Sequence, residues 1–166
     1  DGLDYKQWFN NLVTLWKSNT VKRLHVMATI NGLCLLSLPG FIEHLIDFKM
    51  GWGKDSLSFT LNILRFPSFQ SPVVMPEHVK VDCINNLEIL VKRYENSPYL
   101  HQMEVEHIKR LINYLGAVNS PHEGASSMEL LQKDFKSFYS QYDERRNKNF
   151  LDTFPSLREW YNGIQL

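Results

Sequence analysis

Histidines are the side chains of this sequence most able to bind a metal or to move a proton near neutral pH. His101, Glu104 and His107 follow one another at intervals of three in a segment with helical periodicity. Such a spacing puts the two histidines about 120° apart around a helix, whereas a zinc-binding helix has its histidines four positions apart. We therefore expect these three side chains to form a polar helix surface. His25 and His44 are expected to have satisfied polar atoms at the boundary of the core.

Other signatures of catalysis are missing from the sequence, and we assign no catalytic residue and no metal ligand. There is no G-x-S-x-G motif, no P-loop and no G-x-G-x-x-G. Cys34 and Cys83 are too few for a four-cysteine zinc or iron–sulfur site. With 18 basic and 18 acidic residues the formal net charge is zero, which disfavours nucleic acid and anionic membranes as partners. No apolar run approaches the roughly 20 residues of a membrane span, and we expect a cytoplasmic protein.

The first half of the chain predicts alternating helices and strands. An amphipathic helix is expected over Leu3–Lys17, a buried strand over Leu24–Ile30, a helix from Ser37 to near Lys49, and a second strand over Leu57–Leu64. Alternation at this spacing favours parallel strands with crossover helices. Because two strands do not complete a sheet, we expect the rest of it to come from a partner chain or from a portion that precedes Asp1.

After Pro76 the pattern is helical only. Apolar residues recur at helical spacing in residues 76–94, 103–115 and 128–142, and a short last helix is expected from Pro155. The polar loop 119–127 is the best linker candidate. Because the pattern changes near Pro76, we expect the chain to be divided into residues 1–75 and 76–166.

Polar residues stand at the carboxyl ends of both expected strands. Thr29 and Asn31 follow the first strand, and Asn62, Leu64 and Pro67 lie at the end of the second. Ligands of parallel α/β proteins bind at this end of the sheet. Turn formation is the alternative role for Thr29 and Asn31, because asparagine after a strand commonly bonds to the backbone.

A charged run, Asp143-Glu144-Arg145-Arg146, follows the last long helix. It is interpreted either as a helix end whose arginines complement the helix dipole or as a clamp that pairs with carboxylates or phosphates.

Three segments resemble radical S-adenosylmethionine (SAM) proteins of the branch that contains twitch domains. LHVMATINGLCLLSLPGFIEHLIDF is similar to the fifth strand and following helix of that family, and LNILRFPSFQSPVVMPEHVK is similar to the sixth strand and its exit loop. FYSQYDERRNKNFLDTFPSLREWY resembles the ending D-x-R-R-x-x-N-F-x-x-x-F-P-E-L of the branch. The matches occur in the family's order and cover most of the chain.

The resemblance implies an α/β fold in which residues 1–75 are the C-terminal part of a partial (β/α)₆ barrel and residues 76–166 a helical region capping it. It also implies reductive cleavage of S-adenosylmethionine by a [4Fe–4S] cluster, giving a 5′-deoxyadenosyl radical. Cofactor contacts carry over to Thr29, Asn31, Leu64 and Pro67. The cluster motif C-x-x-x-C-x-x-C is absent from this chain, so the cluster is expected in a portion that the chain does not contain.

A second hypothesis belongs to another functional class. Because these 166 residues hold no complete catalytic constellation, the chain would be a non-catalytic α/β and helical interaction module. It would bind a partner protein through Trp16, Trp52 and Trp160.

Overall fold

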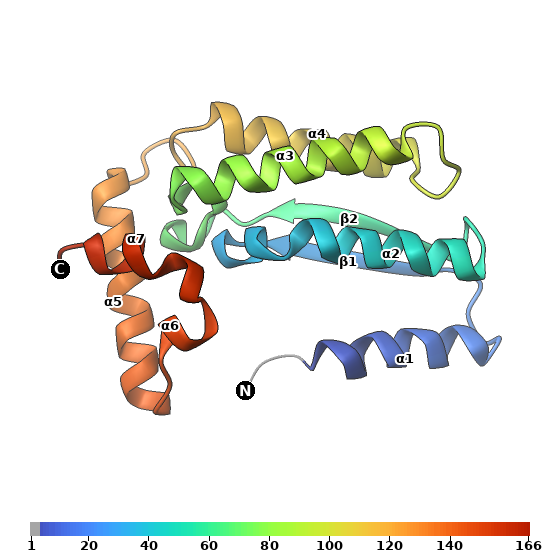
Figure 1. The fold of residues 1–166 in the computed structure, drawn as a ribbon, viewed down its shortest axis with the longest axis horizontal. Helices are drawn as coiled ribbons and strands as arrows, with labels where there is room; N and C mark the ends of the chain where they lie inside the picture. The colour runs from blue at the N-terminus through green and yellow to red at the C-terminus, as the bar shows by residue number, and fades with distance from the viewer. Residues whose placement is uncertain (1–3) are drawn as a thin grey trace.

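The computed structural model describes residues 4–166, so Asp1 to Leu3, where the first expected helix begins, lie outside the described residues. Helices account for 64% of these described residues, and two strands among them form one parallel sheet (Figure 1). In chain order the elements are α1 (Tyr5–Lys17), β1 (Leu24–Ile30), the 3-10 turn η1 (Gly32–Leu36), α2 (Leu38–Trp52), β2 (Leu57–Ile63), the 3-10 turns η2 (Ser68–Gln70) and η3 (Pro72–Val74), α3 (Glu77–Tyr94), α4 (Gln102–Ala117), α5 (Met128–Arg146), α6 (Phe150–Thr153), η4 (Pro155–Leu157) and α7 (Arg158–Gly163).

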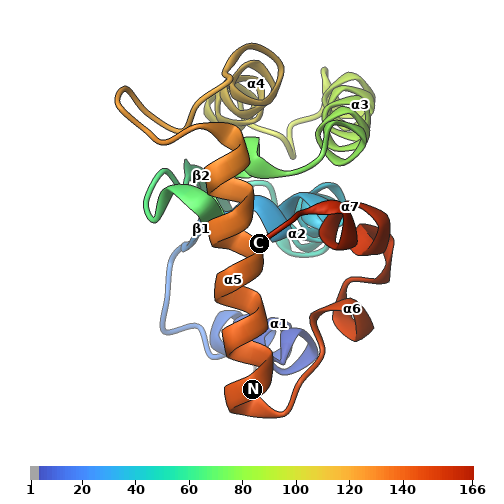
Figure 2. The ribbon, with the colours of Figure 1, turned by 90° about the vertical axis from the view of Figure 1, so that its left-hand side faces the viewer.

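The two strands and the helix between them form a β–α–β unit. β1 and β2 pair in parallel, with Leu24 opposite Leu57 and Ile30 opposite Ile63. The β1–α2–β2 order predicted from the sequence is confirmed, although α2 continues three residues beyond Lys49 to Trp52. It is followed by the C-cap Gly53, whose φ of 104° suits glycine. The apolar side chains of the strands face α2 and α3, which lie to one side of the sheet in Figure 2.

Helix α1 joins the molecule through aromatic side chains. Its Tyr5, Trp8 and Phe9 rings pack against aromatic rings of α2, and the Trp8 and Phe41 centroids, for example, are 5.9 Å apart. This packing holds α1 against the outer face of α2 rather than in the sheet.

The outer edge of β2 is covered by α4. The Glu104 carboxylate accepts a hydrogen bond of 3.2 Å from the Phe59 backbone N–H, and the Arg110 guanidinium donates to the Leu61 carbonyl. These are the outward groups of β2 that a further strand would need. The sheet cannot continue on that side. The described residues form a mostly helical protein with a two-stranded open sheet, and the prediction of a (β/α) barrel portion is wrong.

The C-terminal helices lie beyond the carboxyl ends of both strands (Figure 1). α5 contacts η2 and η3, the turns that follow β2. The Phe150 ring of α6 packs between α5 and α7, 5.7 Å from Phe135 and 4.5 Å from Tyr161. The helical character predicted for the second half of the chain is confirmed, and its last three helices stand next to the end of the sheet where a ligand is expected.

Candidate functional site

One face of the sheet is polar, and no helix of residues 4–166 covers it. Along β1 and β2, the side chains that point away from α2 are those of His25, Met27, Thr29, Ser58, Thr60 and Asn62. His25 Nδ1 lies 2.9 Å from the Ser58 hydroxyl, and its Nε2 lies 3.3 Å from the Thr60 hydroxyl. Both ring nitrogens of His25 therefore have hydrogen-bonding partners, as predicted, although the side chain is exposed and does not lie at the boundary of the core.

His44 also has the expected hydrogen bond, because its Nδ1 lies 2.7 Å from the Tyr5 hydroxyl. The expected polar surface at His101, Glu104 and His107 is only partly present. Glu104 is buried with 2% of its surface exposed, whereas His101 and His107 are half-buried.

Three of the four residues predicted to contact a cofactor gather at the carboxyl end of the sheet. Thr29 is exposed and stands opposite Asn62 in the strand register. The backbone N–H of Leu64 donates to the Ile30 carbonyl oxygen at 2.9 Å, which extends the pairing to the last residue of β1.

Asn31 ends the strand and caps the following turn. Its Oδ1 accepts a hydrogen bond of 3.0 Å from the backbone N–H of Cys34, which is the turn role considered for it. Its side-chain NH₂ bonds to none of the described residues and remains a donor. The Thr29 hydroxyl is equally unpaired within residues 4–166, so two polar groups remain free at this end of the sheet. Pro67 is exposed three residues beyond Leu64.

The residues that the structure describes do not fit an iron–sulfur cluster. Cys83 is buried in α3, and burial raises the pKa of its thiol to about 12. Cys34, half-buried in η1, has its Sγ 3.8 Å from the Thr29 carbonyl oxygen. Within residues 4–166, no three His, Cys, Asp or Glu side chains stand close enough together to hold a metal ion. We derive no step through a cluster from these residues.

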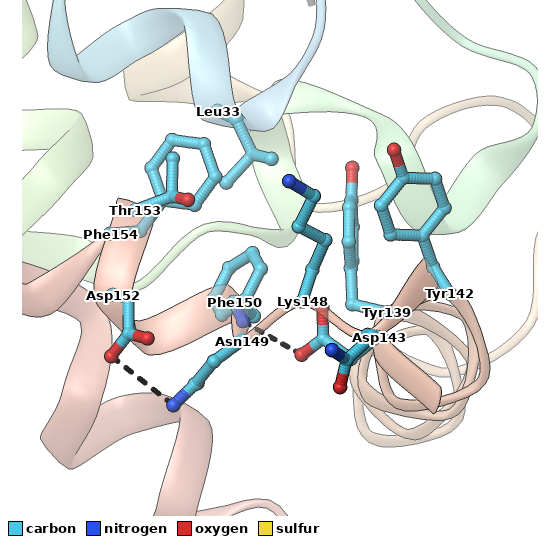
Figure 3. A pocket seen from close by; sticks show the side chains of 11 residues that line it. Leu33, Tyr139, Tyr142, Asp143, Lys148, Asn149, Phe150, Asp152, Thr153 and Phe154 are labelled. Atoms are coloured by element: carbon cyan, nitrogen blue, oxygen red, sulfur yellow. Dashed lines mark hydrogen bonds between the residues drawn. The ribbon is translucent and has the colours of Figure 1, made fainter. Parts of the chain in front are cut away.

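A first cavity, the α5 cavity, opens between η1 and the C-terminal helices. It encloses about 730 Å³ and is lined by Leu33, by the end of α5 and by the loop and helix that follow. Figure 3 shows the Lys148 amine and the Tyr139 and Tyr142 hydroxyls pointing to the same side of it. Burial raises the pKa of Tyr139 to about 12, so this phenol is a neutral donor.

Both carboxylates of the α5 cavity already accept hydrogen bonds. Asp143 Oδ2 accepts from the Phe150 backbone N–H at 2.7 Å, and Asp152 Oδ1 accepts from the Asn149 side chain at 3.2 Å (Figure 3). The first residue of the charged run therefore accepts the first N–H of α6, whose N-cap is Asn149. Arg145 and Arg146 lie in the last turn of α5, where cations complement the helix dipole.

A second cavity, the α4 cavity, lies where the end of β2 meets α4. It encloses about 560 Å³, and Asn62, Arg65, Arg110, Asn113 and Tyr114 line it together with small apolar groups. It contains two arginines and no carboxylate. Arg110 donates to the Leu61 carbonyl and lies 3.1 Å from His107 Nδ1. Burial, assisted by the Arg110 charge, lowers the pKa of His107, so its ring is a neutral acceptor.

A buried ion pair fixes α4 against the sheet. Lys49 Nζ of α2 lies 2.6 Å from Glu104 Oε2, and the two side chains are 0% and 2% exposed. Glu104 also accepts from the backbone N–H groups of Phe59 and His101. Burial lowers the pKa of Lys49, an effect opposed by its contact with Glu104. The pair thereby positions Arg110 two turns further along the same helix.

The three tryptophans proposed as a docking surface mostly contact other rings of the chain. Trp16 and Trp52 both lie against Phe48, and the Lys17 ammonium stands 5.5 Å from the Trp52 ring. Trp160 packs on Phe135, and its indole N–H is buried without a partner in the described part of the chain.

Sequence reasoning missed Arg65, Arg110 and Lys148 as candidate site residues. Arg110 lies in a segment with no recognisable ligand-binding motif, and its proximity to the end of β2 arises from packing. Lys148 occupies a variable position of the terminal motif D-x-R-R-x-x-N-F. Glu104 did carry a signal: a glutamate three residues after a helix start typically bonds back to the backbone. That pattern predicts a cap, but not the burial of the carboxylate.

Comparison with known proteins yields no family whose model matches this chain, no matching curated protein and no matching solved structure. Among the helices of residues 4–166, none is long and apolar enough to cross a membrane. The resemblance to radical SAM proteins therefore depends on the three sequence segments alone.

Proposed function

We propose that this chain is the C-terminal part of a radical SAM enzyme and that the carboxyl end of its sheet faces S-adenosylmethionine or the substrate. The observation that carries the proposal is the uncovered polar face of a parallel β–α–β unit, with unpaired donors of Thr29 and Asn31 at its carboxyl end. This is the end at which parallel α/β proteins bind ligands. The proposal combines that placement with the three ordered sequence matches.

The free edge of β1 supports a further part of the proposal. β1 bonds to β2 through its even-numbered residues, as the contacts of Leu24 and Ile30 at the two ends indicate. In a parallel ladder the backbone groups of His25, Met27 and Thr29 then point away from β2. Apart from the Cys34 thiol near Thr29, no described residue bonds to them. A strand from another part of the enzyme, or from a partner chain, would pair with this edge.

The cluster would be held outside these 166 residues, by a C-x-x-x-C-x-x-C motif. We place the enzyme in the cytoplasm, where reducing conditions preserve the thiolates that such a cluster needs.

The first test is the intact mass and full sequence of the natural protein, followed by anaerobic reconstitution with iron and sulfide. The expected result is an upstream cysteine triplet and the visible absorption of a [4Fe–4S] cluster. A full-length protein that stays colourless would contradict the enzyme proposal and favour the non-catalytic interaction module.

The second test concerns the sheet end itself and uses equilibrium dialysis of S-adenosylmethionine with the reconstituted enzyme. Thr29→Val removes an exposed hydroxyl, and Asn31→Asp keeps the acceptor that caps η1 while removing the free NH₂. Each is expected to weaken binding about fivefold, the value of one hydrogen bond. Thr20→Val, far from the sheet end, is the control. Unchanged binding in both variants would show that Thr29 and Asn31 do not belong to the cofactor site.

A further inference from the structure

The α4 cavity concentrates positive charge in a protein of zero net charge. Its charged lining residues are Arg65 and Arg110, and no acidic residue lines it. None of the ion pairs among residues 4–166 includes either arginine. Two guanidinium groups therefore share a concave surface without a carboxylate to neutralise them.

Arg110 is held in place through one terminal nitrogen of its guanidinium, Nη2. Its Nη2 donates to the Leu61 carbonyl and lies 3.1 Å from His107 Nδ1. A guanidinium has five N–H donors in a planar fork. The Nε–H and Nη1–H donors of Arg110 bond to no residue in the described range, so each of them can donate a charge-assisted hydrogen bond to an anion.

The Arg65 guanidinium lies over the ring of Tyr114. Its guanidinium carbon lies 5.8 Å from the centre of the Tyr114 ring. Tyr114 is itself fixed, because it is buried and its hydroxyl lies 3.0 Å from the Ser71 hydroxyl. Arg65 makes no hydrogen bond with residues 4–166, so its complete fork is available. Asn62 and Asn113 add neutral amide donors to the same cavity.

We propose that the α4 cavity binds the oxyanion group, a carboxylate or a phosphate, of a small ligand. The carboxyl-terminal end of α4 opposes this with a charge of about −0.5, which the two positive charges exceed. The α5 cavity is less suited to an anion because Asp143 and Asp152 line it beside a single lysine. The inference concerns Arg65 and Arg110, which the proposed function does not use, so either can fail without the other.

An NMR titration of the ¹⁵N-labelled protein tests the proposal. Inorganic phosphate and acetate are the probes, and sodium chloride at matched ionic strength is the reference. The side-chain Nε–H resonances of Arg65 and Arg110 report on binding directly. We expect both to shift saturably with at least one probe. Saturation by phosphate alone would assign a phosphate ligand, saturation by acetate alone would assign a carboxylate, and saturation by both would support a site for either oxyanion.

Arg65→Gln is the test variant, and Arg146→Gln is its matched control. Arg146 lies 5.7 Å from the Tyr142 ring, so each change removes one positive charge and one arginine–tyrosine contact. We expect Arg65→Gln to weaken binding about tenfold through loss of charge-assisted hydrogen bonds, and Arg146→Gln to leave it unchanged. The proposal is overturned if neither probe shifts the arginine resonances beyond chloride, or if both variants weaken binding equally. Thermal melts verify that both variants are folded.

Discussion

Replacement of Glu104 by alanine tests the argument that a buried ion pair attaches α4 to the sheet. The change removes the only ion partner of Lys49 among the described residues and the acceptor of the Phe59 N–H. Loss of one member of a buried pair costs about 3–5 kcal/mol, and an orphaned buried N–H adds about 1–3 kcal/mol. Lys49 can release its proton, because burial already lowers its pKa. This limits the cost, and we expect the free energy of unfolding to fall by about 4–6 kcal/mol.

Urea denaturation followed by circular dichroism measures this loss, with Glu106→Ala as the control. Glu106 lies on the same helix in an exposed pair with Lys109, at 3.9 Å, and its removal is expected to cost less than about 1 kcal/mol. Should Glu104→Ala prove too unstable to fold, Glu104→Gln retains an acceptor for Phe59 and is expected to lose less. A loss below about 1 kcal/mol in Glu104→Ala, equal to that of the control, would refute the reasoning.

Three further predictions follow from the cysteines and from the end of α5. Iodoacetamide should modify Cys34 in the native protein and the buried Cys83 only on unfolding. Peptide mass spectrometry measures the two labelling rates, and equal rates would contradict the burial of Cys83. Folding raises the Cys83 pKa from 9.0 to about 12, so the folded state retains a proton that the unfolded state loses. Stability should therefore fall as the pH rises above 9, and Cys83→Ala should show a shallower fall in pH-dependent urea midpoints; an identical slope would contradict it. Asp143→Ala should cost about 1 kcal/mol in thermal or urea unfolding because the Phe150 N–H loses its acceptor, whereas Asp134→Ala, an exposed change in the same helix, should cost almost nothing.

The candidate site could be predicted only in part. Thr29 and Leu64 lie at one end of the sheet, as expected, because parallel strands have their carboxyl ends on the same edge. Asn31 was recognised as a possible turn former and does cap η1. The arginines of the α4 cavity were not predicted, because each is an ordinary surface residue until β2 and α4 meet.

The sequence by itself determined the local elements of this protein. β1 spans the expected residues Leu24–Ile30, and α2, α3, α4 and α5 lie where apolar residues recur at helical spacing. Those periodicities are carried by consecutive side chains and need no distant contact. Only the tertiary structure decided what stands beside β2. Glu104 and Arg110 bond to its outer edge, and neither contact was predicted from the sequence. That outcome depends on contacts between segments far apart in the chain, and no local period encodes them.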